Sequence, residues 1–150
     1  MKIKAGVVGA AGFAGAELVR LLLRHPDFDL SVITSDALAG TPLRDVYPAF
    51  AGASELVFSK HDENLLKGLD VAFLAVPHTA SLALTPKLIA DGVTVIDLSA
   101  DYRLADPAVY EKWYKVPHTS TDLLAARAFG LPELFGEGLA RAAADHAAGK

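Results

Sequence analysis

The chain has 150 residues, of which 52% are hydrophobic and 21% charged, so it can bury the core of one domain. Its net charge of −4 and its scattered Lys and Arg form no basic stripe, which argues against a nucleic-acid partner. No apolar run reaches the roughly 20 residues of a membrane span, and the N-terminal residues lack the pattern of a signal peptide. We therefore expect a cytoplasmic protein without a membrane partner. The lack of cysteine excludes disulfides and thiolate metal sites.

Short apolar runs alternate with amphipathic segments along most of the chain. The helix predicted at residues 79–90 contains Pro86, which predicts a kink or two consecutive short helices. We predict strands over residues 3–8, 30–34, 70–76 and 93–98, with a weaker one over 55–59. We predict helices over residues 12–24, 62–66 and 79–90, after Asp106 with Pro107 at the first position, and over 136–148 with Gly149 as the stop; residues 35–48 are mostly loop.

Alternation of strands and helices through short links predicts a parallel sheet with right-handed crossovers. The fold class is therefore α/β, with a Rossmann-like doubly wound parallel sheet and helices on both faces. We expect residues 1–150 to form one dinucleotide-binding domain. Tyr110, Trp113 and Tyr114 lie on one flank of a predicted helix, where aromatic side chains indicate packing.

Three glycines lie between the first strand and the first helix. Gly9 allows a tight turn, Gly12 lets the backbone approach a pyrophosphate, and Gly15 lets the helix pack closely on the strand. Their spacing, G-x-x-G-x-x-G, departs from the commonest dinucleotide fingerprint, but their position at the first strand-to-helix junction favours nucleotide binding.

The second predicted strand ends at Thr34, Ser35 and Asp36, where the adenosine ribose is expected. Asp36 would accept hydrogen bonds from ribose hydroxyls and favour NAD, whereas Thr34 and Ser35 could donate to a 2′-phosphate and favour NADP. A turn in which Asp36 bonds its own backbone is the structural alternative.

Further polar residues follow the later strands at the same sheet edge. His78, after Pro77, could line the cofactor crevice or cap the next helix. Arg103 could bind a carboxylate or phosphate, or pair with Asp101 to fix a loop. The histidines have no metal-ligand spacing, so we predict no metal site.

These motifs together resemble the N-acetyl-gamma-glutamyl-phosphate reductases of arginine biosynthesis, of the semialdehyde dehydrogenase superfamily. The matching stretches occur in family order: VGAAGFAGAEL at 8–18, FLAVPH at 73–78, DLSADYRL at 97–104, YEKWY at 110–114 with His118, and GLPEL at 130–134. Two positions differ: Asp36 stands where many members have an arginine that meets the 2′-phosphate, and Phe129 replaces a tyrosine.

The resemblance implies NADPH-dependent reduction of an acyl phosphate to an aldehyde, with release of phosphate. A cysteine thiolate forms a thioester that hydride transfer reduces. That cysteine, and a catalytic histidine of a second catalytic and dimerisation domain, lie beyond this chain, which we expect to be inactive alone and to belong to a homo-oligomer. No catalytic residue is expected here. The implied cofactor-binding residues are Gly9, Ala11, Gly12, Phe13, Ala14, Gly15, Thr34, Ser35, Ala75, Pro77, His78 and Ser99; Arg103 would bind the small-molecule acyl phosphate.

Two other functions are also consistent with the sequence. The lysine-pathway reductase of acetylaminoadipyl phosphate resembles this chain almost as well. A non-catalytic dinucleotide sensor would need an outward interaction surface, for which Tyr110, Trp113 and Tyr114 are the only candidates.

Overall fold

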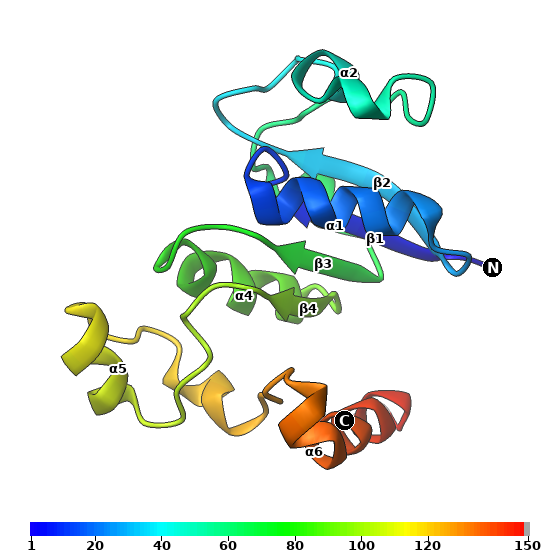
Figure 1. Ribbon diagram of the computed structural model, residues 1–150. Coiled ribbons are helices and arrows are strands. Elements are labelled where there is room, and N and C mark those ends of the chain that lie inside the picture. The colour runs from blue at the N-terminus through cyan, green and yellow to red at the C-terminus, as the bar shows by residue number, and fades with distance from the viewer. Residues whose placement is uncertain (149–150) are drawn as a thin grey trace. The chain divides into compact units, whose positions relative to one another are not determined.

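A sheet of four parallel strands, in the order β2-β1-β3-β4, forms the centre of the first part of the chain (Figure 1). The computed structural model describes residues 1–148. The strands are β1 (Ile3–Val8), β2 (Phe28–Thr34), β3 (Val71–Leu74) and β4 (Thr94–Asp97). The α-helices are α1 (Phe13–Arg24), α2 (Leu43–Val46), α3 (Glu63–Leu66), α4 (Ala80–Ala90), α5 (Pro107–Tyr114) and α6 (Pro132–Ala147), with 3-10 turns η1 (Pro48–Phe50) and η2 (Thr121–Ala125).

Consecutive residues of β1 face opposite sides of the sheet, as strand geometry requires. Val7 packs in a core cluster with Val19 and Leu22 of α1. Val8 packs in a second cluster with Leu88 of α4. Both faces of the sheet are therefore covered by helices, which confirms the predicted doubly wound α/β architecture.

Helix α4 is one continuous helix with Pro86 inside it, in place of the two short helices that the sequence allowed. Proline lacks the N–H that an interior helical residue donates. Leu82 and Leu88, on either side of Pro86, are both buried. Packing of these side chains outweighs the local helix-breaking preference, as tertiary context commonly does.

Residues 55–59, predicted as a weak strand, form only isolated bridges. Ser59 pairs in parallel with Thr34, while Val57 pairs antiparallel with Pro42. The segment changes its partner and direction within a few residues, so no ladder can extend. Pro42 also has no N–H to contribute to one. The prediction of a strand here was wrong, although Phe58 is buried as a strand residue would be.

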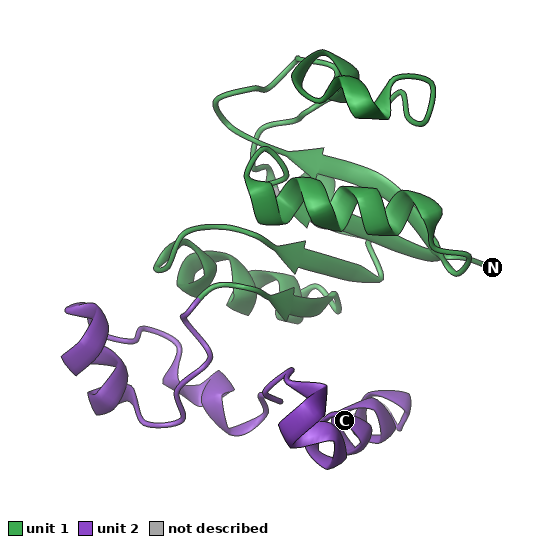
Figure 2. Cartoon of the chain, in the orientation of Figure 1, with its two compact units in different colours: residues 1–99 green, residues 100–150 purple. Residues whose placement is uncertain are grey.

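The structure divides the chain into two compact units, residues 1–99 and 100–150 (Figure 2). In the second unit, Asp106 caps α5 as predicted, since its carboxylate accepts the N–H of Ala108 at 2.8 Å. Helix α6 begins at Pro132, earlier than predicted, and Phe135 within it has non-helical backbone angles. The predicted stop at Gly149 lies outside the described residues.

The aromatic flank of α5 is only partly a packing surface. Tyr110 is fully buried and stacks on Tyr114, with ring centroids 4.8 Å apart. Trp113 is 71% exposed.

No helix within residues 1–148 is long and apolar enough to cross a membrane.

Candidate dinucleotide-binding site

The last residues of the four strands lie side by side at one edge of the sheet. Val8 is in register with Thr34 on one side and with Leu74 on the other, and Leu74 is in register with Asp97. The chain runs from β1 to β2 on one side and returns to β3 on the other, so the order reverses between β1 and β3. Open parallel sheets bind ligands in the crevice at such a reversal, outside the carboxyl ends of the strands.

The turn after β1 is fixed by main-chain contacts with both neighbouring strands. The N–H groups of Gly9 and Ala10 both donate to the carbonyl of Thr34, at 3.2 and 3.0 Å. Gly9 has φ +82°, and a Cβ there would stand 2.4 Å from the carbonyl oxygen of Ala75. Only glycine combines that backbone angle with that approach. The structure thus has the tight turn that the sequence predicted at Gly9.

The other two glycines differ in what surrounds them. A Cβ on Gly15 would lie 2.3 Å from the carbonyl oxygen of Gly9, so this residue lets α1 pack directly against the turn. A Cβ on Gly12 would meet only the Gly9 oxygen, at an ordinary 3.7 Å, and Gly12 has an extended backbone with φ −80°. No residue that the structure describes requires glycine at position 12, so a group from outside the chain has room to approach this Cα.

The start of α1 presents main-chain donors to this space. The first bond of the helix is that from the Ala16 N–H to the Gly12 carbonyl, at 2.8 Å. The N–H groups of Phe13, Ala14 and Gly15 precede it and have no acceptor within the helix. A helix N-terminus of this kind favours an anion. The side chain of Phe13 is 96% exposed.

Ala11, at the middle of the turn, is fixed by a residue that sequence reasoning did not single out. The hydroxyl of Tyr47 donates to the Ala11 carbonyl at 2.5 Å. Tyr47 lies in the segment predicted as loop, and no local pattern indicated that it would reach back to the glycine turn.

At the end of β2, Thr34 and Asp36 are both bonded to His61. The Thr34 hydroxyl, which is fully buried, lies 2.6 Å from Nδ1 of His61. The His61 N–H donates to Oδ1 of Asp36 at 2.9 Å. Ser35 is buried, and its N–H donates to the Ser59 carbonyl at 2.9 Å. His61 was missed because a lone histidine after an irregular segment carries no spacing signal.

On the other side of the turn, the segment after β3 forms the second wall. The Ala75 N–H donates to the Val8 carbonyl at 2.8 Å, which continues the pairing of β1 with β3. Pro77 and His78 are exposed. Thr79 has φ 75°, a left-handed conformation that is unusual for a β-branched residue and that begins α4.

Beyond β4, the carboxylate of Asp97 positions Ser99. It accepts both the Ser99 hydroxyl at 2.8 Å and the Ser81 hydroxyl at 2.7 Å through Oδ2, and the Ser99 N–H through Oδ1. Ser81 is fully buried in α4. Residues near Gly9, Thr34, Ala75 and Ser99 thus come from segments that follow four strands ending at one edge.

Arg103 belongs to the second unit, and its N–H donates to the Ala100 carbonyl at 3.2 Å. Its neighbour Asp101 is fully buried and accepts the Tyr110 hydroxyl at 2.7 Å. Asp101 therefore has a structural partner on α5. The substrate role of Arg103 stays a prediction.

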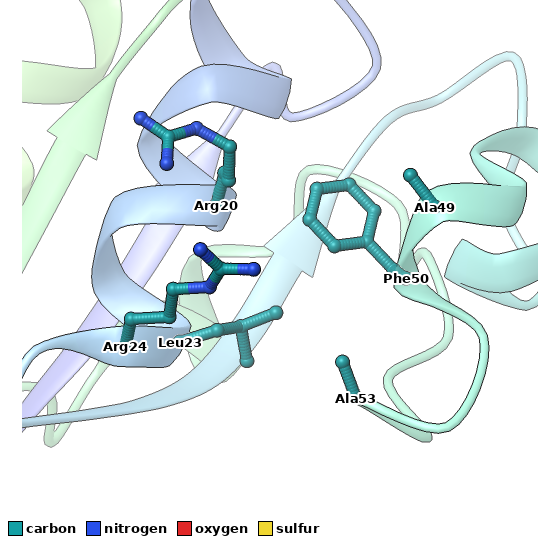
Figure 3. Close-up of a pocket in the computed structure, with 6 residues that line it drawn as sticks. All are labelled: Arg20, Leu23, Arg24, Ala49, Phe50 and Ala53. Carbon is teal, nitrogen blue, oxygen red and sulfur yellow. The ribbon is translucent and has the colours of Figure 1, made fainter.

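A separate cavity lies between α1 and the segment around η1 (Figure 3). Arg20 is bonded to Glu17, and this hydrogen bond raises the pKa of Arg20 above its ordinary value. None of the predicted cofactor-binding residues lines the cavity. Its lining residues are Arg20, Leu23, Arg24, Ala49, Phe50 and Ala53.

Comparison with known proteins decides which dinucleotide-binding family this fold represents. A family model described as "Semialdehyde dehydrogenase, NAD binding domain" matches residues 4–142. The chain belongs to this family. The glycine turn at the β1/β3 crevice is thus part of an NAD-binding domain, as the sequence motifs indicated.

Curated relatives of the chain agree with the resemblance read from those motifs. N-acetyl-gamma-glutamyl-phosphate reductase of Herminiimonas arsenicoxydans is 48% identical over 88% of this chain and 38% of its own length. The protein of the same name from Bordetella pertussis (strain Tohama I) is 46% identical over 94% of this chain and 40% of its own length. The chain thus spans about two fifths of the length of these relatives.

Solved structures of semialdehyde dehydrogenases share the fold. Aspartate semialdehyde dehydrogenase with NADP from Candida albicans has a TM-score of 0.58 and 24% identity over 69% of this chain and 31% of its own. Aspartate semialdehyde dehydrogenase II from Vibrio cholerae has a TM-score of 0.59 and 19% identity over 69% of this chain and 30% of its own. These likenesses confirm the α/β sheet architecture.

Proposed function

We propose that this chain is the NADP-binding part of an N-acetyl-gamma-glutamyl-phosphate reductase, which reduces the acyl phosphate to N-acetylglutamate semialdehyde and releases phosphate. The observation that carries the proposal is the 48% and 46% identity, over most of the chain, to proteins of that name. Its membership of the semialdehyde dehydrogenase NAD-binding family supports the cofactor part of the proposal.

The glycine turn suits the pyrophosphate of a dinucleotide. Gly12 has open space on its Cα and lies between a turn fixed by Gly9 and the donor end of α1. A diphosphate can therefore come within hydrogen-bonding distance of main-chain N–H groups that have no helical acceptor. Gly9, Ala11, Gly12, Phe13, Ala14 and Gly15 would form this cradle.

The segments on either side of the glycine turn would hold the two ends of the dinucleotide. The segment after β2, with Thr34 and Ser35, would receive the adenosine, and the segment after β3, with Ala75, Pro77 and His78, would border the nicotinamide side. Asp97 would keep the Ser99 hydroxyl in one orientation, since that hydroxyl donates to its carboxylate. Arg103 would bind the substrate phosphate or carboxylate through its planar guanidinium.

The bound dinucleotide supplies the hydride that reduces the acyl group. The chain has no cysteine, so the nucleophile implied by the family resemblance is not among its residues. We propose that residues 1–150 act as the dinucleotide-binding domain beside a catalytic and dimerisation domain, in a cytoplasmic homo-oligomer. The chain alone would bind the cofactor without turning over substrate.

Titration of the chain with NADPH tests this proposal. NADPH should bind, because the residues proposed to hold its phosphates and its adenosine lie in residues 1–99. Addition of N-acetyl-gamma-glutamyl phosphate should not lower the absorbance of the reduced nicotinamide. Failure of both NADPH and NADH to bind at millimolar concentration would overturn the cofactor assignment. Oxidation of NADPH on addition of the acyl phosphate would overturn the assignment as a non-catalytic part.

A further inference from the structure

Segment 59–61 runs beside the end of β2 and extends the adenosine side of the sheet edge. The Ser59 N–H donates to the Ile33 carbonyl at 3.0 Å, and the Ser35 N–H returns a bond to the Ser59 carbonyl at 2.9 Å. Residues 60 and 61 therefore lie next to the residues that follow β2. The sequence motifs did not include this segment.

Asp36 has a partner within the protein in this arrangement. Its Oδ1 accepts the His61 main-chain N–H at 2.9 Å, and its Oδ2 lies 4.0 Å from Nε2 of the same residue. A carboxylate that favours NAD must accept from the ribose hydroxyls. Oδ1 of Asp36 thus already accepts from the His61 main chain, so the carboxylate also holds residue 61 in place.

The His61 ring lies against polar groups at and after the end of β2. Thr34 Oγ1, 2.6 Å from Nδ1, is a hydroxyl that can accept, and Asp36 faces Nε2. The His61 ring is therefore held beside the end of β2, with Nδ1 against the Thr34 hydroxyl.

Lys60 adds a cation beside this ring. Lys60 is exposed and lines an open hollow together with His61, Asp62 and Asn64. The Asp62 carboxylate in that hollow accepts the Asn64 N–H at 2.8 Å, which orients it toward the start of α3. The hollow therefore holds an ammonium and an imidazole beside the place where the adenosine ribose would lie.

We propose that Lys60 and His61 receive the 2′-phosphate of NADP, and that Asp36, which accepts the His61 N–H, positions them. The inference rests on the proposed function, because it assumes that a dinucleotide occupies the crevice. It gives this chain a preference for NADP despite an aspartate where many relatives of the resembled family have an arginine. Charge-assisted contacts to phosphate replace that arginine from a neighbouring segment.

Binding of adenosine 2′,5′-bisphosphate and of AMP to the intact chain isolates the 2′-phosphate contribution, since the two probes differ only in that group. The bisphosphate should bind more tightly than AMP. Lys60→Met should weaken the bisphosphate roughly tenfold and leave AMP unchanged, because a hydrogen bond to a charged group is lost. Lys67→Met is the matched control, since the Lys67 ammonium pairs with Asp91 at 3.3 Å, and it should leave the ratio of the two affinities unchanged.

Two further variants test the roles of Asp36 and His61. Asp36→Asn keeps an acceptor for the His61 N–H and removes the negative charge, so the bisphosphate should bind several times more tightly while AMP is unaffected. His61→Phe removes the ring nitrogens and should lower the ratio of bisphosphate to AMP affinity, an effect that a purely structural role would not produce.

The outcomes separate this inference from the proposed function. If NADPH binds the unaltered chain but Lys60→Met leaves the ratio of bisphosphate to AMP affinity unchanged, the 2′-phosphate lies elsewhere and the inference is wrong. If neither NADPH nor either adenosine probe binds the unaltered chain, the proposed function fails instead.

Discussion

Gly9 and Ala75 are in main-chain contact: the turn after β1 comes so close to the segment after β3 that a Cβ on Gly9 would stand 2.4 Å from the Ala75 carbonyl oxygen. This contact fixes the two walls of the β1/β3 crevice relative to each other. Within residues 1–99, the relative position of these two walls is therefore set by the packing of the folded sheet.

Replacing Gly9 with alanine should lower the free energy of unfolding by more than about 2 kcal/mol, because strain at positive φ adds to the overlap with Ala75. Gly40→Ala is the matched control. Gly40 has φ +86° and nothing within 4 Å of a Cβ, so that variant measures the backbone strain alone, about 1 kcal/mol. Urea unfolding of both variants checks the difference, and equal losses would mean that the contact with Ala75 contributes nothing.

The sequence predicted the sheet and the glycine turn because their signals are local. Apolar runs at β1 and β3 mark strands covered on both faces, and the spacing of Gly9, Gly12 and Gly15 marks the junction with α1. These signals need no knowledge of distant residues. The backbone of the candidate cofactor site was therefore the most predictable part of the chain.

Contacts between distant segments could not be predicted in the same way. His61 bonds Thr34 and Asp36 across more than twenty intervening residues, and Tyr47 bonds Ala11 across thirty-five. Nothing in the periodicity of either segment identifies its partner. The same limit explains why the prediction of a strand at residues 55–59 was wrong. The pairing of this segment depends on partners in two different segments.

In the second unit, Tyr110→Phe should destabilise the fold by about 1–3 kcal/mol, because the buried carboxylate of Asp101 loses its 2.7 Å donor. Trp113→Phe, on the same helix but 71% exposed, should change the free energy of unfolding by less than about 0.5 kcal/mol. Chemical unfolding of the two variants provides the comparison. A Tyr110→Phe variant as stable as the unaltered chain would show that Asp101 does not depend on this hydroxyl.

On α1, the hydrogen bond from Arg20 lowers the pKa of the Glu17 carboxyl from its ordinary value of 4.5. A lowered folded-state pKa stabilises the fold above the unfolded value and loses that effect as pH falls through the folded value. The melting temperature of Glu17→Gln should therefore lie slightly below that of the unaltered chain at neutral pH, and the gap should close below pH 4.5. Because the pair is exposed, the gap should be small and should shrink with salt. A gap that widens in acid would contradict this sign.

The most direct measurement of the central claim is calorimetric titration of Gly12→Val with NADPH beside its urea unfolding curve. Gly12 has an extended backbone and open space around its Cα, so valine should change the free energy of unfolding by no more than about 1 kcal/mol. The branched side chain would occupy the approach of the pyrophosphate, so binding should fall below detection. Affinity for NADPH equal to that of the unaltered chain, in a variant that folds normally, would show that the diphosphate does not bind at this turn.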